Sequence, residues 1–277
     1  MRYLVKLFLR LIWGFLTNTW NLQHWRAYNA GKSQNPPIFI VGCGHSGTSL
    51  LLSILGAHSR IYAVPNETAL AFDWGTEKPR LRKTVELFLW YLDSKAIRAG
   101  KMRWVEKTPK HITAISLLLG LRPNAKIIII IRDGRDVAIS LMKRYKTLGE
   151  GIERWINDNR VAEPFWNHPN VYKMRYEDLI ADFDTTMRDL LLFLGEDYED
   201  QISRYYETPK FFYAKKIEKP ASEADPDHKT YRNWQINQPL FDNRGKWKAL
   251  GEDEKQLIKD VAGDMLIEYG YAEDKNW

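Results

Sequence analysis

Cysteine is nearly absent from this sequence, and that absence narrows the class of protein. Cys43 is the only cysteine among 277 residues. Neither an internal disulfide nor a cysteine-based metal cluster can therefore form within the chain. We see no other grouping of side chains with metal-ligand spacing, and we expect no metal. A reducing compartment fits this composition, so we predict a cytoplasmic protein.

Long uncharged apolar runs are also lacking, even in the apolar stretch at residues 1–17. Arg2, Lys6 and Arg10 interrupt that stretch, whereas a membrane-spanning helix needs about 20 mainly apolar residues. No small-residue cleavage site follows an uncharged apolar segment, so a cleaved secretory signal is not expected. The three cations share one stripe of an amphipathic helix, which favours peripheral contact with the inner face of a membrane. Packing against the chain's own domain or in a homodimer is the alternative, and the oligomeric state stays open.

The charge balance is modestly basic. A net charge of +6 suits an acidic or phosphorylated ligand, but it is too small and too evenly spread to indicate nucleic-acid binding. Hydrophobic residues make up 44% of the chain and charged residues 27%, which is the ordinary range of globular proteins. We therefore predict an amphipathic helix and connector over residues 1–36, followed by one domain over residues 37–277.

Short apolar runs alternate with helical patterns along that domain. Strands are predicted at residues 38–41, 61–64, 104–105, 126–131 and 171–174. Helices are predicted at residues 46–56, 81–98, 112–121, 137–145, 151–165, 185–194 and 253–269. This alternation predicts an α/β fold, a three-layer sandwich with a central parallel sheet flanked by helices. Residues 207–245 carry no regular pattern and are predicted to form a functional lid.

A glycine-rich loop follows the first predicted strand and precedes the first helix. In this position, successive backbone N–H groups at a helix N-terminus form a site for an anion. The candidate ligands in this loop are Gly44, His45, Ser46, Gly47, Thr48 and Ser49. Gly42 and Gly47 have P-loop spacing, but Thr48 replaces the lysine that serves the β- and γ-phosphates of a nucleoside triphosphate. The fold is therefore expected to be P-loop-like, with a ligand other than a triphosphate.

A second polar segment follows the strongest predicted strand. Arg132 ends this strand, and the ends of parallel strands line the crevice where open α/β sheets bind ligands. Ser140 lies two turns along the next helix and Arg144 one turn further, so both can face the same phosphate. The planar fork of arginine suits a terminal phosphate. Arg135 and Asp136 are interpreted as part of a surface ion-pair network.

Both segments resemble parts of the sulfotransferase family that uses 3′-phosphoadenosine-5′-phosphosulfate (PAPS) as its sulfuryl donor. The run FIVGCGHSGTSL at residues 39–50 is similar to the family's 5′-phosphosulfate loop, and is closest to the tyrosylprotein, heparan-type and bacterial branches. The run KIIIIIRDGRDVAIS at residues 126–140 resembles its 3′-phosphate segment. The resemblance implies that Tyr176 approaches the nucleotide and that Lys246 closes over the 3′-phosphate. His45 is a departure, because the family usually has arginine or lysine there.

The resemblance also implies which residues carry the chemistry. Sulfuryl transfer needs a base for the acceptor's proton, and cations or hydrogen-bond donors for the charge on the transferring group. Glu67 corresponds to the base of the tyrosylprotein and heparan O-sulfating branches, and it is the preferred base. Glu106 stands where the N-sulfating branch has its base. Lys107 corresponds to a lysine that contacts the sulfuryl oxygens, and His45 can donate a hydrogen bond to the bridging or sulfate oxygen.

The sequence leaves open the identity of the acceptor and two alternative classes of protein. A carbohydrate or glycan hydroxyl is the preferred acceptor, with a protein tyrosine, a lipid, a small phenol or an amine as alternatives. A P-loop nucleotide kinase or NTPase is opposed by Thr48 and by the lack of an obvious Mg²⁺-binding carboxylate after an apolar strand. A non-catalytic, membrane-associated binding module is opposed by the presence of Glu67, Lys107, Arg132 and Ser140 together.

Overall fold

A parallel sheet of five strands forms the centre of the computed structural model, which describes residues 36–73, 78–145, 147–212, 217–218 and 228–277. The strand order is β2-β3-β1-β4-β5, and neighbouring strands pair in parallel. The strands are β1 (Ile38–Val41), β2 (Ile61–Ala63), β3 (Arg103–Lys107), β4 (Lys126–Ile131) and β5 (Val171–Arg175). This arrangement confirms the predicted strands and the parallel sheet.

The run of isoleucines in β4 is explained by burial on both faces of the sheet. Side chains of a strand point alternately to opposite faces. Ile127, Ile129 and Ile131 belong to the core on one face, and Ile128 and Ile130 to the core on the other. A central parallel strand has helices on both sides, so an uninterrupted apolar sequence is what such a strand needs.

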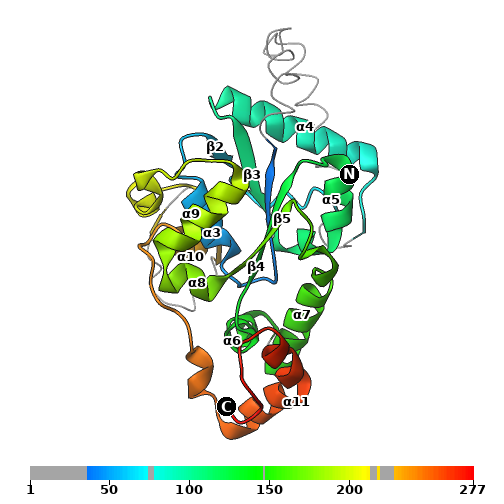
Figure 1. Ribbon diagram of the computed structural model, residues 1–277, viewed down its shortest axis with the longest axis vertical. Coiled ribbons are helices and arrows are strands. Elements are labelled where there is room, and N and C mark those ends of the chain that lie inside the picture. Colours follow the sequence, from blue (N-terminus) through cyan, green and yellow to red (C-terminus); the bar gives the residue numbers. More distant parts are fainter. Residues whose placement is uncertain (1–35, 74–77, 146, 213–216, 219–227) are drawn as a thin grey trace.

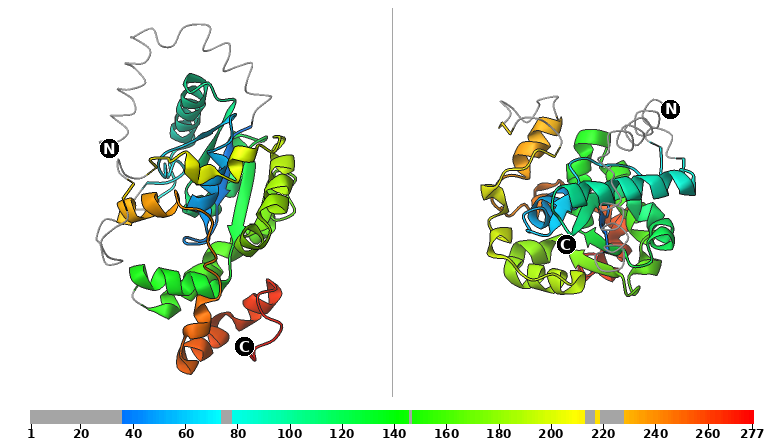
Figure 2. Two further views of the ribbon diagram at one scale, coloured as in Figure 1. Left: turned by 90° about the vertical axis from the view of Figure 1, so that its left-hand side faces the viewer. Right: turned by 90° about the horizontal axis from the view of Figure 1, so that it is seen from above.

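Helices cover both faces of the sheet (Figures 1 and 2). One core contains side chains of α4 (Arg82–Arg98), a 3-10 helix at Pro109–Ala114, and α5 (Ile115–Leu121). The other core contains side chains of α3 (Thr48–Leu55), α8 (Tyr176–Ala181) and α9 (Phe183–Leu194). The three-layer α/β sandwich predicted from the sequence is thereby confirmed.

A third group of helices lies beyond the carboxyl ends of the strands, in the lower part of Figure 1. Its members are α6 (Gly134–Tyr145), α7 (Leu148–Arg160) and α11 (Glu252–Glu268). They share a core of their own, which includes the fully buried side chains of Leu141 and Trp155. This group forms one wall of the region where the loops after the strands meet.

Residues 207–245 are more regular than the sequence suggests. They contain α10 (His228–Gln235), which is held by side-chain amides of Asn233 and Asn237. Asn233 Oδ1 accepts a hydrogen bond from Phe212 N at 2.9 Å, and Asn237 Oδ1 accepts one from Lys210 N at 2.8 Å. The expectation of a wholly irregular segment was wrong because these polar contacts, rather than an apolar stripe, anchor the helix. Its lid role stays a prediction.

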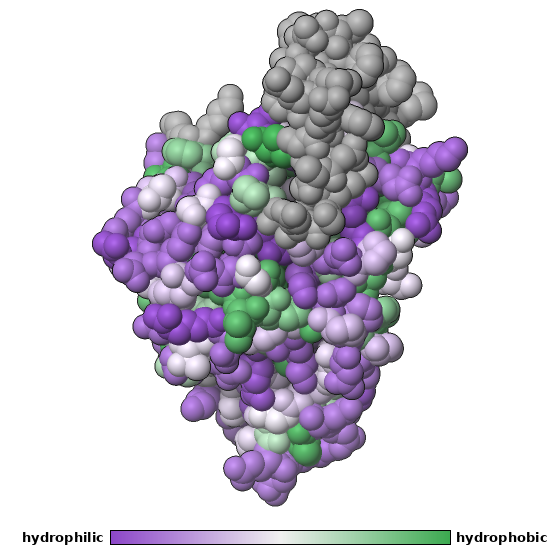
Figure 3. Space-filling view, turned by 45° about the horizontal axis from the view of Figure 1, so that its top comes forward, coloured by the Kyte–Doolittle hydropathy of each residue, from purple (hydrophilic) through white to green (hydrophobic). Residues whose placement is uncertain are grey.

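On the face drawn in Figure 3, the hydrophobic areas of the described residues are small. Figure 3 shows hydrophobic side chains in patches separated by hydrophilic ones. None of the helices in the described residues has both the length and the apolarity that crossing a membrane requires. The amphipathic helix predicted at residues 1–17 lies outside the described residues, so its contact with a membrane stays a prediction.

Candidate active site

The loops after β1, β3 and β4 meet at one edge of the sheet, because β1 lies between β3 and β4. In register, Val41 of β1 lies beside Ile129 of β4, and Ile40 lies beside Lys107 of β3. The chain leaves β1 toward β2 on one side of the sheet and leaves β4 toward β5 on the other. Such a switch point is where open α/β sheets bind ligands.

Two glycines shape the loop after β1. A Cβ on Gly42, which has φ +153°, would lie 2.5 Å from the carbonyl oxygen of Ile130. A Cβ on Gly47, with φ +96°, would lie 2.6 Å from the ring of Tyr176. Ser46 is fully buried, and its Oγ has no hydrogen-bond partner among the described residues. A close-packed loop with a buried donor at the start of α3 suits a bound anion.

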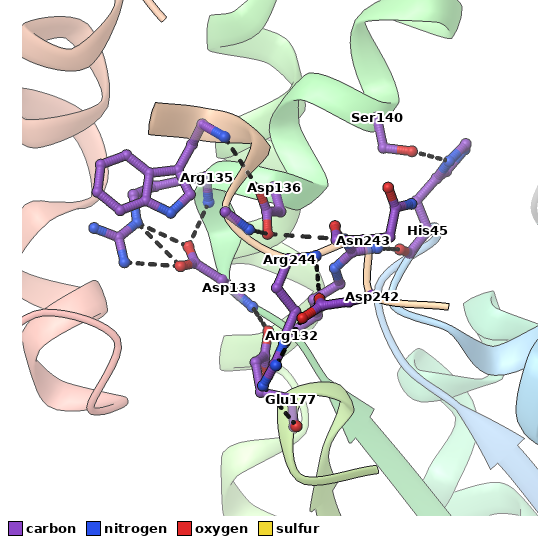
Figure 4. A network of polar contacts seen from close by, with 12 residues as sticks. His45, Arg132, Asp133, Arg135, Asp136, Ser140, Glu177, Asp242, Asn243 and Arg244 are labelled. Carbon is purple, nitrogen blue, oxygen red and sulfur yellow. Dashed lines mark hydrogen bonds and ion pairs between the residues drawn. The ribbon is translucent and has the colours of Figure 1, made fainter. Parts of the chain in front are cut away.

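His45 connects this loop to the segment after β4. Its backbone has φ 69°, and its Nδ1 lies 2.8 Å from Ser140 Oγ on α6 (Figure 4). Its carbonyl oxygen accepts a hydrogen bond from Arg132 Nη1 at 3.3 Å. The two segments that the sequence assigned to opposite ends of one nucleotide are therefore in direct contact.

The guanidinium of Arg132 lies within the polar network drawn in Figure 4. Its Nη2 donates to the carbonyl oxygen of Asn243 at 2.7 Å and lies 3.8 Å from a carboxylate oxygen of Asp136. Its Cζ lies 4.3 Å from the ring centre of Tyr176, and burial raises the pKa of that tyrosine. Arg132 Nε is buried and has no partner among the described residues. Because its shortest contacts are with neutral carbonyls, this cation suits an anionic ligand.

Arg135 and Asp136 do not form the predicted surface network, since both side chains are buried. Arg135 pairs with Asp133 at 2.7 Å. Asp136 accepts hydrogen bonds from the backbone N–H groups of Gly245 at 2.7 Å and Trp247 at 3.2 Å. The prediction was wrong because no local pattern reveals that a segment more than a hundred residues later folds onto the start of α6.

Glu67 lies in the loop after β2 and forms an ion pair with Lys107, the last residue of β3. The Lys107 side chain is 1% exposed and the Glu67 side chain 20%. Arg232 of α10 approaches the same carboxylate, with Nη1 at 3.4 Å from Oε1. Glu67 is therefore a partly exposed carboxylate held between two cations. A group that reaches its exposed side can transfer a proton to it.

Glu106 is completely buried. Its Oε1 accepts hydrogen bonds from Thr68 N at 3.0 Å and from the Thr108 hydroxyl, and its Oε2 lies 3.1 Å from His111 Nδ1. Burial raises its pKa, but the ion pair with His111 and the hydrogen bonds from Thr108 and Thr68 outweigh burial, so the pKa lies below its ordinary value. Its contacts hold the backbone directly after Glu67.

One cation beside the glycine loop was missed by the sequence analysis. A Cβ on Gly44 would lie 3.6 Å from Nη2 of Arg154 on α7, and Arg154 pairs with Asp158 at 3.1 Å. Burial and the charge of Asp158 raise the pKa of the neighbouring Cys43 thiol. The helical pattern predicted α7, but it does not reveal which turn of that helix packs against the loop.

The remaining candidate ligands are distributed over three elements. Thr48 and Ser49 begin α3, Tyr176 begins α8, and Lys246 is exposed within a 3-10 helix after the Asn243 contact. Arg144 belongs to α6, but its side chain lies outside the described residues. Within the described part of the chain, no group of three or more His, Cys, Asp or Glu side chains is arranged to hold a metal ion.

Comparison with known proteins places similarity along most of the chain. A model of the sulfotransferase family matches residues 76–200. An uncharacterized protein of Aquifex aeolicus is 29% identical over an alignment of 220 residues, and the match covers 67% of this chain but only 29% of that protein. Protein-tyrosine sulfotransferase A of Caenorhabditis elegans is 25% identical over an alignment of 275 residues, and the match covers 87% of this chain and 69% of the relative.

Two solved structures share the fold. The sulfotransferase domain from the curacin biosynthetic pathway has a TM-score of 0.54 at 18% identity, covering 82% of this chain and 98% of that one. Mouse sulfotransferase SULT7A1 complexed with PAP has a TM-score of 0.52 at 16% identity, with coverages of 88% and 93%. At such identities the likeness concerns the fold, and it agrees with the sheet described above.

Proposed function

Because this chain belongs to the sulfotransferase family, we propose that it transfers a sulfuryl group from PAPS to a hydroxyl group of an acceptor. The observation that carries the proposal is the contact of His45 with both Ser140 and Arg132. It joins a loop suited to a phosphosulfate and a cationic segment suited to a second phosphate. The bound PAP of the mouse structure, adenosine 3′,5′-bisphosphate, supports the same nucleotide here.

The donor is proposed to be held by both segments. Buried polar atoms without partners among the described residues, Ser46 Oγ and Arg132 Nε, fit an anion at this edge. The proposed ligands of the 5′-phosphosulfate are Gly44, His45, Ser46, Gly47, Thr48 and Ser49. The proposed ligands of the 3′-phosphate are Arg132, Ser140, Arg144 and Lys246, with Tyr176 packing beside the nucleotide.

The transfer step is proposed to use Glu67 as base. Glu67 takes the acceptor's hydroxyl proton while the acceptor oxygen forms a bond to sulfur. The bond from sulfur to the bridging phosphate oxygen breaks, and PAP leaves with that electron pair. Lys107 stabilises negative charge on the sulfuryl oxygens, and His45 donates a hydrogen bond to the bridging oxygen. Protonated Glu67 then returns its proton to solvent through its exposed side.

The geometry supports Glu67 over Glu106 for this role. Glu67 is partly exposed, whereas Glu106 is fully buried and both its oxygens are engaged. An acceptor hydroxyl cannot reach Glu106 without displacing those partners. We propose that Glu106 is a positioning residue, because it binds both the backbone N–H and the hydroxyl of Thr68, the residue that follows Glu67.

The acceptor is proposed from two classes. A carbohydrate or glycan hydroxyl is the acceptor preferred in the sequence analysis. A protein tyrosine is the second candidate, and it is supported by the similarity to protein-tyrosine sulfotransferase A of Caenorhabditis elegans. Incubation with ³⁵S-labelled PAPS and a panel of oligosaccharides, tyrosine peptides and small phenols distinguishes them. Transfer to any of these also excludes a non-catalytic binding module, and transfer to none contradicts the proposal.

Thermal unfolding with nucleotides tests the donor class. A ligand at a hundred times its dissociation constant adds about 2.7 kcal/mol to the stability of the native state. For a domain of this size that raises Tm by about 5–10 °C. We expect this shift with PAP, and a much smaller one with ATP and Mg²⁺. The reverse order would favour a nucleotide kinase or NTPase instead.

A further inference from the structure

The segment 242–247 lies beside Arg132 and is also held by Asp136, which is not a proposed donor ligand. Asp136, on the first turn of α6, accepts hydrogen bonds from the N–H groups of Gly245 and Trp247 at 2.7 and 3.2 Å. Lys246 lies between these two residues. At its other end the segment is joined to Arg132 through the carbonyl oxygen of Asn243 at 2.7 Å (Figure 4).

An aromatic stack holds the far side of this segment. The Arg135 guanidinium lies 3.8 Å from the ring centre of Trp247 and 4.5 Å from that of Trp277. The two indoles meet edge to face, with centroids 5.2 Å apart. Arg135 is itself fixed by the carboxylate of Asp133 and the carbonyl oxygen of Tyr271. A cation in contact with two indole rings is favourable and directional, so it fixes the position of Trp247.

We infer that the Arg135–Trp247–Trp277 stack positions segment 242–247 for recognition of the 3′-phosphate. The inference rests on the proposed function, because it takes the 3′-phosphate of PAPS as the ligand beside Arg132. Lys246 is covalently flanked by Gly245 and Trp247, whose amides are bound to Asp136. A shift of Trp247 therefore moves the Lys246 backbone, and with it the carbonyl contact of Asn243 to Arg132.

Trp277 belongs to the stack but, among the described residues, contacts no proposed ligand of the donor. Among its described contacts, Trp277 meets the rings and cations of Trp247, Arg135 and Lys259, the last on α11 at 5.2 Å. None of these three is a proposed ligand of the donor. An effect of Trp277 on nucleotide affinity is therefore indirect, through Trp247, through Arg135 or through the core of α6, α7 and α11 against which Trp277 packs. Both tryptophans are positioning residues rather than ligands.

The test compares two nucleotides that differ only in the 3′-phosphate. Isothermal titration calorimetry gives the affinities of the whole chain for PAP and for adenosine 5′-monophosphate. We expect Trp247→Ala to weaken PAP binding about tenfold, and Trp277→Ala about threefold. Both are expected to leave the monophosphate affinity within about twofold, and Trp247→Phe to restore most of the loss.

A matched control removes a similar stack elsewhere. Arg188 lies 4.0 Å from the ring centre of Tyr198, and Arg188→Gln is expected to change neither affinity. Measurements on the wild-type protein distinguish a failure of the proposed donor from a failure of the positioning role. Equal wild-type affinity for both nucleotides would contradict the proposed donor itself. A wild-type preference for PAP that folded Trp247→Ala and Trp277→Ala retain, or an equal loss for both nucleotides, would overturn the positioning role alone.

Discussion

Replacing Glu67 by glutamine removes the proposed base and keeps the size of the side chain. A general base contributes about 10²- to 10⁴-fold to a reaction rate, which corresponds to about 2.7–5.5 kcal/mol of activation free energy. We therefore expect kcat of Glu67→Gln to fall at least about a hundredfold. The affinity for PAP is expected to stay within about twofold, because Glu67 pairs with Lys107 and Arg232 rather than with the two segments proposed to bind the donor.

The same substitution also acts on stability, and the two effects have to be separated. Lys107 is 1% exposed, and removing one partner of a buried ion pair costs about 3–5 kcal/mol. Glu67 and Arg232 are 20% and 27% exposed, so solvent reduces that cost. We expect the free energy of unfolding to fall by about 1–2 kcal/mol. Urea unfolding measures this loss, and a protein that remains folded at the assay temperature keeps kcat interpretable.

The assay is transfer from ³⁵S-labelled PAPS at saturating donor. Glu86→Gln is the matched control, because Glu86 is a half-exposed carboxylate 3.4 Å from Arg82 on the surface of α4, and its variant is expected to keep full activity. Glu106→Gln is measured alongside. Wild-type turnover in Glu67→Gln together with loss of turnover in a folded Glu106→Gln would refute the assignment of the base.

Three further predictions concern the same edge of the sheet. Arg132→Gln is expected to weaken PAP binding by about 10- to 100-fold in calorimetry, and an unchanged affinity would contradict the donor site. His45 carries a charge only when protonated, so the transfer rate is expected to fall from pH 6 to pH 8; a flat profile would leave it a hydrogen-bond donor only. The folded-state pKa of Glu106 is lowered, so its stabilisation is present above the unfolded value of about 4.3 and is lost as pH falls through the folded value. Urea unfolding of Glu106→Gln is expected to show less stability at pH 7 and a weaker acid dependence, and an unchanged acid dependence would contradict the network.

Much of the fold was readable from the sequence because its signals are local. The isoleucine run of β4 indicates a strand that is buried on both faces. The glycines after β1 indicate a loop where other atoms approach the backbone closely. Arg132 and Ser140 are close in sequence, on one strand end and the following helix. Their placement needed only the rule that parallel strands end at a common edge.

The contacts that complete the site depend on segments far apart in the chain. Arg232 reaches Glu67 across 165 residues, and Asp136 binds Gly245 across 109. No periodicity encodes such pairs, since they depend on how α10 and segment 242–247 pack on the finished sheet. Asp136 was interpreted as a surface charge for the same reason, because a buried carboxylate that binds backbone amides looks identical in sequence to an exposed one.

The contact between His45 and Ser140 bears on how the nucleotide enters. It joins the loop after β1 to α6 across 95 residues. The backbone of both segments is therefore already fixed in the folded protein. Binding a nucleotide then requires little further ordering of the backbone, and this is the condition under which association is limited by encounter rather than by rearrangement. A phosphate oxygen can also take the place of the acceptor in the hydrogen bond between His45 and Ser140. The proposed donor site is thus preorganised by the protein's own polar groups.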